Sequence, residues 1–178
     1  MNIFNEGKEQ NIAQVLDSKD RRVALQQKIF AKYPDQILVD VNLNIPGPIK
    51  NNHYLEKLFN YGIKGLEQSW TELGYSYKLV AYLDEDTGCE NFYILNLPIK
   101  VVKQTTIKFE DQTELGRLFD ADVLVKDKNA AISRRDLGEE PRKCFICNRP
   151  AKECARSRRH SVSEMQNYIS NLYTKYVK

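Results

Sequence analysis

Two aspartates lie two residues apart in the stretch Gly116–Val125, at Asp120 and Asp122. The Leu, Phe and Val residues around them predict a short buried strand. Because side chains alternate across a strand, the two carboxylates point to the same side. Like charges so close together repel each other unless a cation or a proton lies between them. The pattern is typical either of a Mg²⁺ site beside a substrate's phosphates or of a strand whose polar face meets water.

Basic residues are concentrated downstream of this pair. The segment 134–160 holds nine Lys and Arg against four acidic residues, a local excess of five positive charges in a chain of net charge +3. Arg binds phosphate through two parallel hydrogen bonds, and nucleotidyl transfer combines a carboxylate-held metal with such groups. A solvated charged face is the alternative reading for any single arginine. The residues expected to contact phosphate are Arg117, Arg134, Arg142, Arg156, Arg158 and Arg159, together with Lys50.

Three cysteines and a histidine follow the pair in the order Cys144-x₂-Cys147-x₆-Cys154-x₅-His160. Three thiolates and one imidazole form a standard tetrahedral Zn²⁺ site, of which Cys-x₂-Cys is the commonest half. Zinc would stabilise a loop that has little apolar content of its own. The alternative is a reduced loop whose thiols are half-buried small hydrophobic groups.

An Arg-rich zinc knuckle also fits another class of protein, a non-catalytic module that binds RNA or an acidic protein. Such a module would bind nucleic acid in a salt-sensitive way and would need neither Mg²⁺ nor the Asp pair. Few aromatic residues accompany the arginines, and the net charge of the whole chain is small. The sequence therefore favours an enzyme without a nucleic-acid partner.

The segment Asn44–Lys50 carries two prolines around a glycine, which fix a sharp and rigid path outside a sheet. It is either a connector between a strand and a helix or a stiff wall beside a substrate. In the second case Asn44 and Lys50 would offer polar atoms at its two ends.

Several elements are expected to position these groups. Alternation over Ile37–Ile45 predicts a strand with apolar residues on one face and Asp40 among the polar residues on the other. A helix capped by Asp17 or Ser18 is expected before this strand, ending near Tyr33.

The rest of the chain is expected to cover the sheet. Residues 52–73 carry apolar side chains at three- and four-residue steps, which predicts a core helix. Residues 75–97 read as a hairpin, and residues 98–111 favour helix over strand. Ser161 and Glu164 form a capping box at the start of a C-terminal amphipathic helix.

These elements predict an α+β fold: a small mixed or antiparallel sheet covered by helices, a Cys- and Arg-rich loop near the C-terminus and the C-terminal amphipathic helix. A length of 178 residues with 42% hydrophobic content fits one domain over 1–178, with 144–160 as a zinc-knuckle-like insert. Neither an export signal nor a membrane span is visible, so we expect a cytoplasmic enzyme with reduced cysteines and no membrane contact.

Five segments carry a further signal. They are 44–50 (NIPGPIK), 116–123 (GRLFDADV), 133–138 (SRRDLG), 141–147 (PRKCFIC) and 154–160 (CARSRRH). In order and spacing they resemble the CitX family, the holo-acyl-carrier-protein synthases of citrate lyase. The resemblance covers nearly the whole chain.

The resemblance implies a transferase. It would move the prosthetic group of 2′-(5″-triphosphoribosyl)-3′-dephospho-CoA onto a serine of the apo acyl carrier (gamma) subunit of citrate lyase and release diphosphate. The Asp pair is similar to the Asp-x-Asp signature with which nucleotidyltransferases hold Mg²⁺. The Gly-Ser helix of polymerase-β-like enzymes is missing, because Gly116 lies only four residues before Asp120. The carrier of malonate decarboxylase, which uses a related group, is the alternative acceptor.

Within the implied reaction, the roles of individual residues follow from their chemistry and not from a full motif match. Asp120, Asp122 and Arg117 would form the catalytic site, with Mg²⁺ bridging the triphosphate. No nucleophile is required from this chain, because the carrier brings its own serine. Acyl carrier proteins are typically acidic, so part of the basic segment would dock the carrier. The third metal ligand remains open among Glu110, Asp136 and Glu139.

Overall fold

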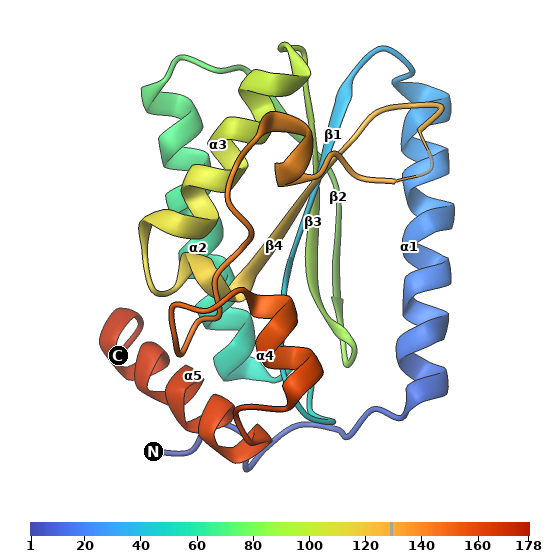
Figure 1. Ribbon diagram of the computed structural model, residues 1–178. Helices are drawn as coiled ribbons and strands as arrows, with labels where there is room; N and C mark the ends of the chain where they lie inside the picture. The colour runs from blue at the N-terminus through green and yellow to red at the C-terminus, as the bar shows by residue number, and fades with distance from the viewer. Residues whose placement is uncertain (129) are drawn as a thin grey trace.

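The computed structural model describes residues 1–128 and 130–178, and within them the chain forms an antiparallel sheet with helices on both faces (Figure 1). The sheet has the strand order β2-β3-β1-β4, with β1 (Ile37–Leu43), β2 (Tyr77–Glu85), β3 (Gly88–Leu95) and β4 (Phe119–Leu124). The helices are α1 (Ile12–Lys32), α2 (His53–Glu72), α3 (Ile99–Gln112), α4 (Ala151–Ser157) and α5 (Val162–Tyr176), with short 3₁₀ turns η1 (Gly116–Leu118) and η2 (Arg134–Leu137). The predicted α+β class is confirmed. No described helix is long and apolar enough to cross a lipid bilayer.

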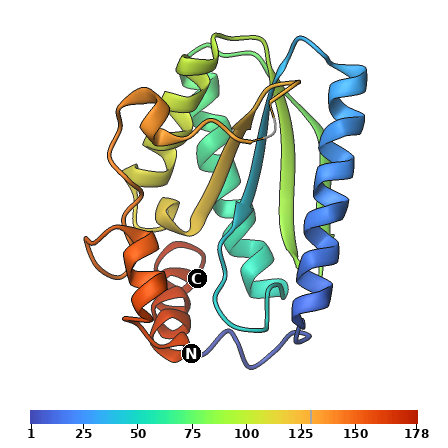
Figure 2. The same ribbon diagram turned by 45° about the vertical axis from the view of Figure 1, so that its right-hand side comes forward.

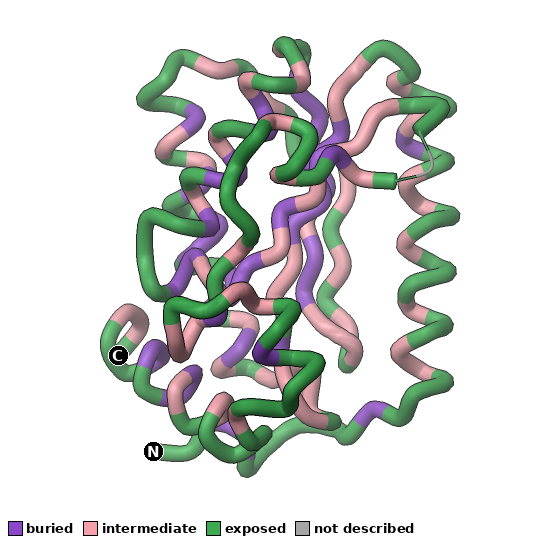
Figure 3. The backbone as a smooth tube through the Cα atoms, viewed as in Figure 1, coloured by how far each residue is buried: buried purple, intermediate pink, exposed green. Residues whose placement is uncertain are grey.

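The two faces of the sheet are covered unequally. Helix α1 lies along one face, and α2 and α3 lie on the other (Figures 1 and 2). The main core fills the α2 side, where Val39 and Val41 of β1 are fully buried. On the α1 side a smaller cluster joins Leu38 and Phe92 to Ile29, which is the one buried residue of α1. Figure 3 shows α1 mostly exposed or half-buried.

The predicted hairpin is confirmed as β2 and β3, and the helix favoured over residues 98–111 is confirmed as α3. The predicted start of the first helix is wrong. Helix α1 begins at Ile12, because Asn11 and Gln14 form a reciprocal capping box. Ser18 lies inside the helix and donates instead to the carbonyl of Val15 at 2.8 Å.

Gly116 allows β4 to begin directly beside the end of α3. A Cβ atom at this position would lie 2.1 Å from the carbonyl oxygen of Phe109 and 3.1 Å from that of Glu110. Both obstacles are backbone atoms of a helix, so they cannot move aside as a flexible side chain would. The glycine therefore fixes the spacing between α3 and the strand that carries the Asp pair.

We expect Gly116→Ala to destabilise the protein by about 3 kcal/mol, because the added methyl group forces α3 and β4 apart. Gly65→Ala is the matched control: Gly65 lies in α2 with no atom within 4 Å of the added Cβ. This control should stabilise by up to about 1 kcal/mol through helix propensity. Urea unfolding of both variants checks the pair. Equal stability of Gly116→Ala and the unchanged protein would contradict the close-approach argument.

Candidate active site and metal centre

Strand β4 is an edge strand, and three of its outward-facing backbone groups are hydrogen-bonded by elements other than strands. Three contacts cover them: the Arg142 guanidinium donates to the Phe119 carbonyl at 3.0 Å, the Ala121 N–H donates to the Glu110 carboxylate at 2.9 Å, and the Ile132 N–H donates to the Val123 carbonyl at 2.8 Å. Satisfied backbone groups hold the edge in place without a further strand. The residues that make these contacts come from α3 and from the segment after β4, which therefore surround the Asp pair.

Asp120 and Asp122 share one face of β4, as the alternation predicts. In the antiparallel register Asp122 lies opposite Asp40 of β1, and Asp120 lies opposite Asn42. The Asp120 carboxylate is 43% exposed and lies 3.4 Å from the Arg142 guanidinium. Burial, reinforced by the charge of Asp120, raises the pKa of Asp122 to about 6. The repulsion between the two carboxylates is thus only partly offset by Arg142 in a partly dry setting, which is where a cation gains most.

A second acidic pair lies beside the first, under α1. Asp40 is 1% exposed and Glu90 of β3 is 6% exposed. Arg22 of α1 forms an ion pair with Glu90, and the Gln26 amide donates to Asp40 Oδ2 at 2.8 Å. Burial, with the neighbouring Glu90 carboxyl, raises the pKa of Asp40 well above its usual range. Asp40 Oδ1 is buried and has no hydrogen-bond partner among the described residues.

A cavity of about 510 Å³ opens over the Asp pair, and we call it the carboxylate cavity. Besides Asp120 and Asp122 it is lined by Lys103, Glu110, Arg134, Arg135, Glu139 and Arg142, with Ala131–Ser133, Pro141 and Pro150–Lys152. Basic side chains therefore face the two aspartates across a space large enough for a small ligand.

Arg134 is held in place by carboxylates of α3. Its guanidinium forms two bonds to Asp111, at 2.8 and 3.0 Å, and one to Glu110 at 2.5 Å. The next turn, η2, is capped by Ser133, whose N–H and hydroxyl bond with Asp136 and lower the pKa of that carboxyl. Two of the three carboxylates expected as further metal ligands, Glu110 and Asp136, are thus engaged in holding the backbone.

The remaining predicted phosphate contacts fall into two groups. A second cavity, of about 500 Å³, is lined by Arg117, Arg142 and Arg158, by Asn44, Pro46, Lys143–Phe145, Ala151, Cys154 and Ala155, and by His160–Val162 and Met165. We call it the knuckle pocket. Arg156 and Arg159 are exposed and line neither cavity. Lys50 also lines neither, and its ammonium donates to the carbonyl of Ile45 at 2.7 Å.

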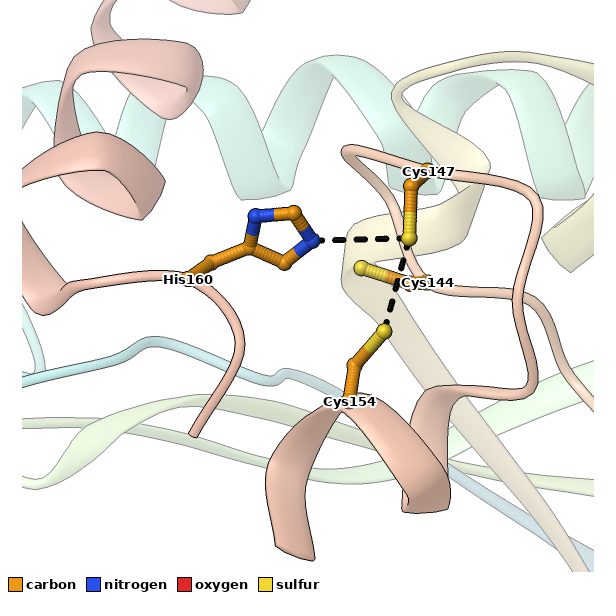
Figure 4. Close-up of side chains that lie close together, drawn as sticks. All are labelled: Cys144, Cys147, Cys154 and His160. Atoms are coloured by element: carbon orange, nitrogen blue, oxygen red, sulfur yellow. Dashed lines mark hydrogen bonds between the residues drawn. The ribbon is translucent and has the colours of Figure 1, made fainter. Parts of the chain in front are cut away.

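The structure brings Cys144, Cys147, Cys154 and His160 together. Their ligand atoms all lie within 4.8 Å of one another, and Figure 4 shows the three sulfur atoms and the imidazole pointing toward a common centre. Cys147 Sγ lies 3.4 Å from both Cys154 Sγ and His160 Nε2. Ligands at 2.0–2.3 Å in a tetrahedron are separated by roughly 3.3–3.8 Å, so the set can hold a metal ion such as zinc.

Local structure places these four ligands. A backbone bridge between Lys143 and Pro150 closes a tight turn that carries the first two cysteines. Cys154 lies on α4, and this helix ends at Arg158, whose left-handed φ of 47° reverses the chain and returns His160 to the cluster. The hydrogen bond with the His160 ring lowers the pKa of Cys147 to about 6. At neutral pH this thiol is therefore largely ionised, as a metal ligand must be.

A model of the apo-citrate lyase phosphoribosyl-dephospho-CoA transferase family, CitX, matches residues 10–176. The chain belongs to this family. It is 39% identical over 163 residues to the probable apo-citrate lyase phosphoribosyl-dephospho-CoA transferase of Streptococcus pyogenes, covering 90% of this chain and 84% of that protein. It is 33% identical over 162 residues to the transferase of the same name from Escherichia coli, covering 91% and 87%.

A third relative of this CitX chain is longer. The chain is 34% identical over 178 residues to protein CitXG of Leuconostoc mesenteroides, and it spans 38% of the length of that protein. The resemblance found in the five sequence segments is thus confirmed over nearly the whole chain. Membership makes this chain an enzyme of the transferase class.

Three residues beside the Asp pair of this CitX family member were not assigned to the site by the sequence analysis. They are Arg22, Asp40 and Glu90, which come from α1, β1 and β3. Asp40 lies on the predicted polar face of its strand. This position was the one feature of the sequence that could have indicated a role for Asp40 in the site. Its position opposite Asp122 depends on the order of the strands in the sheet, which alternation within one strand does not contain.

Proposed function

We propose that this chain transfers the phosphoribosyl-dephospho-CoA group to the acyl carrier subunit of apo-citrate lyase, and that the carboxylate cavity carries the transfer. The observation that supports this most is the half-buried pair Asp120 and Asp122, which lines one cavity together with Arg142, 3.4 Å from Asp120. Its expected substrate is 2′-(5″-triphosphoribosyl)-3′-dephospho-CoA. A serine oxygen of the carrier forms a bond to the α-phosphorus, and the bond from that phosphorus to diphosphate breaks.

Asp120 and Asp122 would hold Mg²⁺ here. A hard cation fits them, because they are oxygen ligands whose mutual repulsion it would relieve. Asp40 lies in register opposite Asp122 with a buried carboxyl, but it forms no three-carboxylate metal group with the pair among the described residues. When bound, the ion would neutralise charge on the triphosphate and act as a Lewis acid at phosphorus.

The protein's own side chains then have separate tasks. Arg142 lies between Asp120 and the cavity wall and would bind the phosphate oxygens on which charge develops. Arg134, held by Glu110 and Asp111, keeps the wall formed by residues 133–138 in position. The proton of the attacking serine would pass to a carboxylate of the Asp pair, which lines the same cavity.

The test is a mass-spectrometric transfer assay. The chain is incubated with apo acyl carrier subunit, triphosphoribosyl-dephospho-CoA and Mg²⁺, and the carrier is then weighed. We expect a mass increase of one prosthetic group on one serine, lost when EDTA is present. Transfer to the malonate decarboxylase carrier alone would overturn the choice of acceptor. Salt-sensitive RNA binding without any transfer would favour the non-catalytic binding module instead.

We further propose that Cys144, Cys147, Cys154 and His160 bind one structural Zn²⁺, as an insert within a single domain over residues 1–178. Support comes from the ligand distances and from the segment itself, in which Cys144 and Cys154 are the buried residues between 141 and 160. All four cysteines of the chain are free thiols, which fits a cytoplasmic enzyme.

The exposed arginines outside both cavities are the proposed docking surface for the acidic carrier. We expect the double variant Arg156→Glu/Arg159→Glu to raise KM for the carrier about tenfold and to weaken its salt dependence, because opposite charges steer association. KM for the small substrate should not change. Steady-state kinetics at two salt concentrations check this.

The matched control is Lys57→Glu/Lys64→Glu, the same charge change on the exposed side of α2. If this control raises KM for the carrier as much, the effect comes from net charge alone and the assigned surface is wrong.

A further inference from the structure

The knuckle pocket has two kinds of wall. Its lining includes the apolar residues Pro46, Phe145, Val162 and Met165 and basic residues, among them Arg117 and Arg158. None of the described residues that line it is acidic. A concave apolar site with a few positive charges is suited to a ligand that joins an anionic group to a neutral chain.

The apolar wall is preformed by tight packing. Gly47 has a φ of 84°, and a Cβ atom there would lie 2.7 Å from Gln166 Nε2 and 3.0 Å from Val162 Cγ1. The Gln166 amide donates to the carbonyl of Pro46 at 3.3 Å. The rigid Pro-Gly-Pro loop is thus pressed against the start of α5, so Pro46 needs no rearrangement to serve as a wall.

The knuckle pocket and the carboxylate cavity meet at Arg142 and Ala151, which line both. Arg142 is 23% exposed, and its guanidinium is anchored to the carbonyl of Phe119 at 3.0 Å. A ligand whose phosphates contact Arg142 from the carboxylate cavity would therefore lie directly beside the knuckle pocket.

We propose that the knuckle pocket binds the dephospho-CoA end of the substrate, with the diphosphate on Arg117 and Arg158 and the neutral pantetheine arm against the apolar wall. This assignment rests on the proposed function for the identity of the substrate. That molecule carries a reacting triphosphate at one end and a diphosphate with a long uncharged arm at the other. The two cavities match these ends in order, since carboxylates for a metal line one and an acid-free apolar wall lines the other.

Binding of 3′-dephospho-CoA and of ADP, measured by calorimetry without Mg²⁺, tests the assignment. Neither probe carries the triphosphate, so neither depends on the Asp pair. We expect 3′-dephospho-CoA to bind at least about tenfold more tightly than ADP, because ADP lacks the arm. The variant Ala155→Trp, which places an indole in the pocket, should remove this difference and raise KM for the full substrate. The control Ala13→Trp, on an exposed position of α1, should preserve both the affinity difference between the two probes and the KM for the full substrate.

A second variant separates charge from shape. Arg158→Asn removes the positive charge, and Asn tolerates the left-handed backbone at this position. This variant should weaken the binding of 3′-dephospho-CoA and the binding of ADP by similar factors, since both ligands carry the diphosphate. Zinc content and circular dichroism of each variant establish that the fold is intact.

The outcomes separate this assignment from the proposed function. Unchanged 3′-dephospho-CoA affinity in Ala155→Trp, or ADP binding as tightly as 3′-dephospho-CoA, overturns the pocket assignment even when transfer is normal. A raised KM for the carrier instead of the small substrate also overturns it and makes the pocket part of the carrier interface. Loss of 3′-dephospho-CoA binding in Ala155→Trp supports the assignment even if the transfer assay fails and the proposed function falls.

Discussion

Replacing Asp122 by Asn is expected to abolish transfer and at the same time to make the protein more stable. Transfer should fall by at least about a thousandfold, because one of the two proposed Mg²⁺ ligands is lost. Stability should rise by about 2 kcal/mol at pH 7, since the variant no longer holds a buried carboxylate beside Asp120. Transfer assays and urea unfolding of the same preparation measure the two effects.

The stability gain of Asp122→Asn should depend on pH, and the raised pKa of Asp122 gives the direction of that dependence. Burial raises the pKa of Asp122 from 3.8 to about 6, so the folded state holds its proton more tightly than the unfolded state. The ionised carboxylate therefore costs stability above pH 6, and this cost disappears as the pH falls from 6 toward 4. The advantage of Asp122→Asn should shrink over the same interval. An advantage that stays constant from pH 4 to 8 would contradict the assigned cause.

Asp120→Asn is the companion variant. Asp120 is 43% exposed, so its replacement should leave the fold intact while removing transfer as completely. It should also lower the pKa of Asp122, because Asp120 is one of the charges that raise it. Full transfer activity in Asp120→Asn would remove the central catalytic assignment.

Loss of zinc is expected to have the second large effect. Metal analysis should find one Zn²⁺ per chain, and Cys147→Ser should lose it. We expect the melting temperature of this variant to fall by more than about 10 °C and transfer to be lost, because the cluster holds the segment that carries Arg142. Treating the unchanged protein with a strong chelator should have the same two consequences.

The matched control is Cys89→Ser. Cys89 is also a buried free thiol, but it lies at the start of β3 and contacts Asn51 and Asp84 instead of the cluster. It should keep its full zinc content and its transfer activity. A chain purified without zinc that melts at the same temperature before and after chelation would show that the cluster is only a set of reduced thiols.

The sequence predicted those parts of the site that depend on spacing along the chain. Alternation placed Asp120 and Asp122 on one face, and Cys and His spacing identified the four members of the metal cluster. In both cases the participating residues lie within seventeen positions of one another, so local geometry was sufficient.

The parts of the site that depend on contacts between distant segments of the chain could not be predicted from spacing along the sequence. Arg134 and Arg142 looked alike in the sequence, yet one is bound by carboxylates of α3 and the other faces Asp120. Asp40 joins the site because β1 lies between β3 and β4, an order set by the packing of the whole sheet. The early start of α1 was missed because Asp17 and Ser18 were interpreted as the cap, whereas Asn11 and Gln14 form the capping box.

The covered edge of β4 has a consequence for encounters between copies of this protein. An open edge strand is a template on which another chain can add a strand and begin an aggregate. Here Arg142, Glu110 and the backbone of Ile132 already occupy three of the positions that an added strand would need. The side chains that shape the cavity are therefore also the ones that keep the protein from templating its own aggregation.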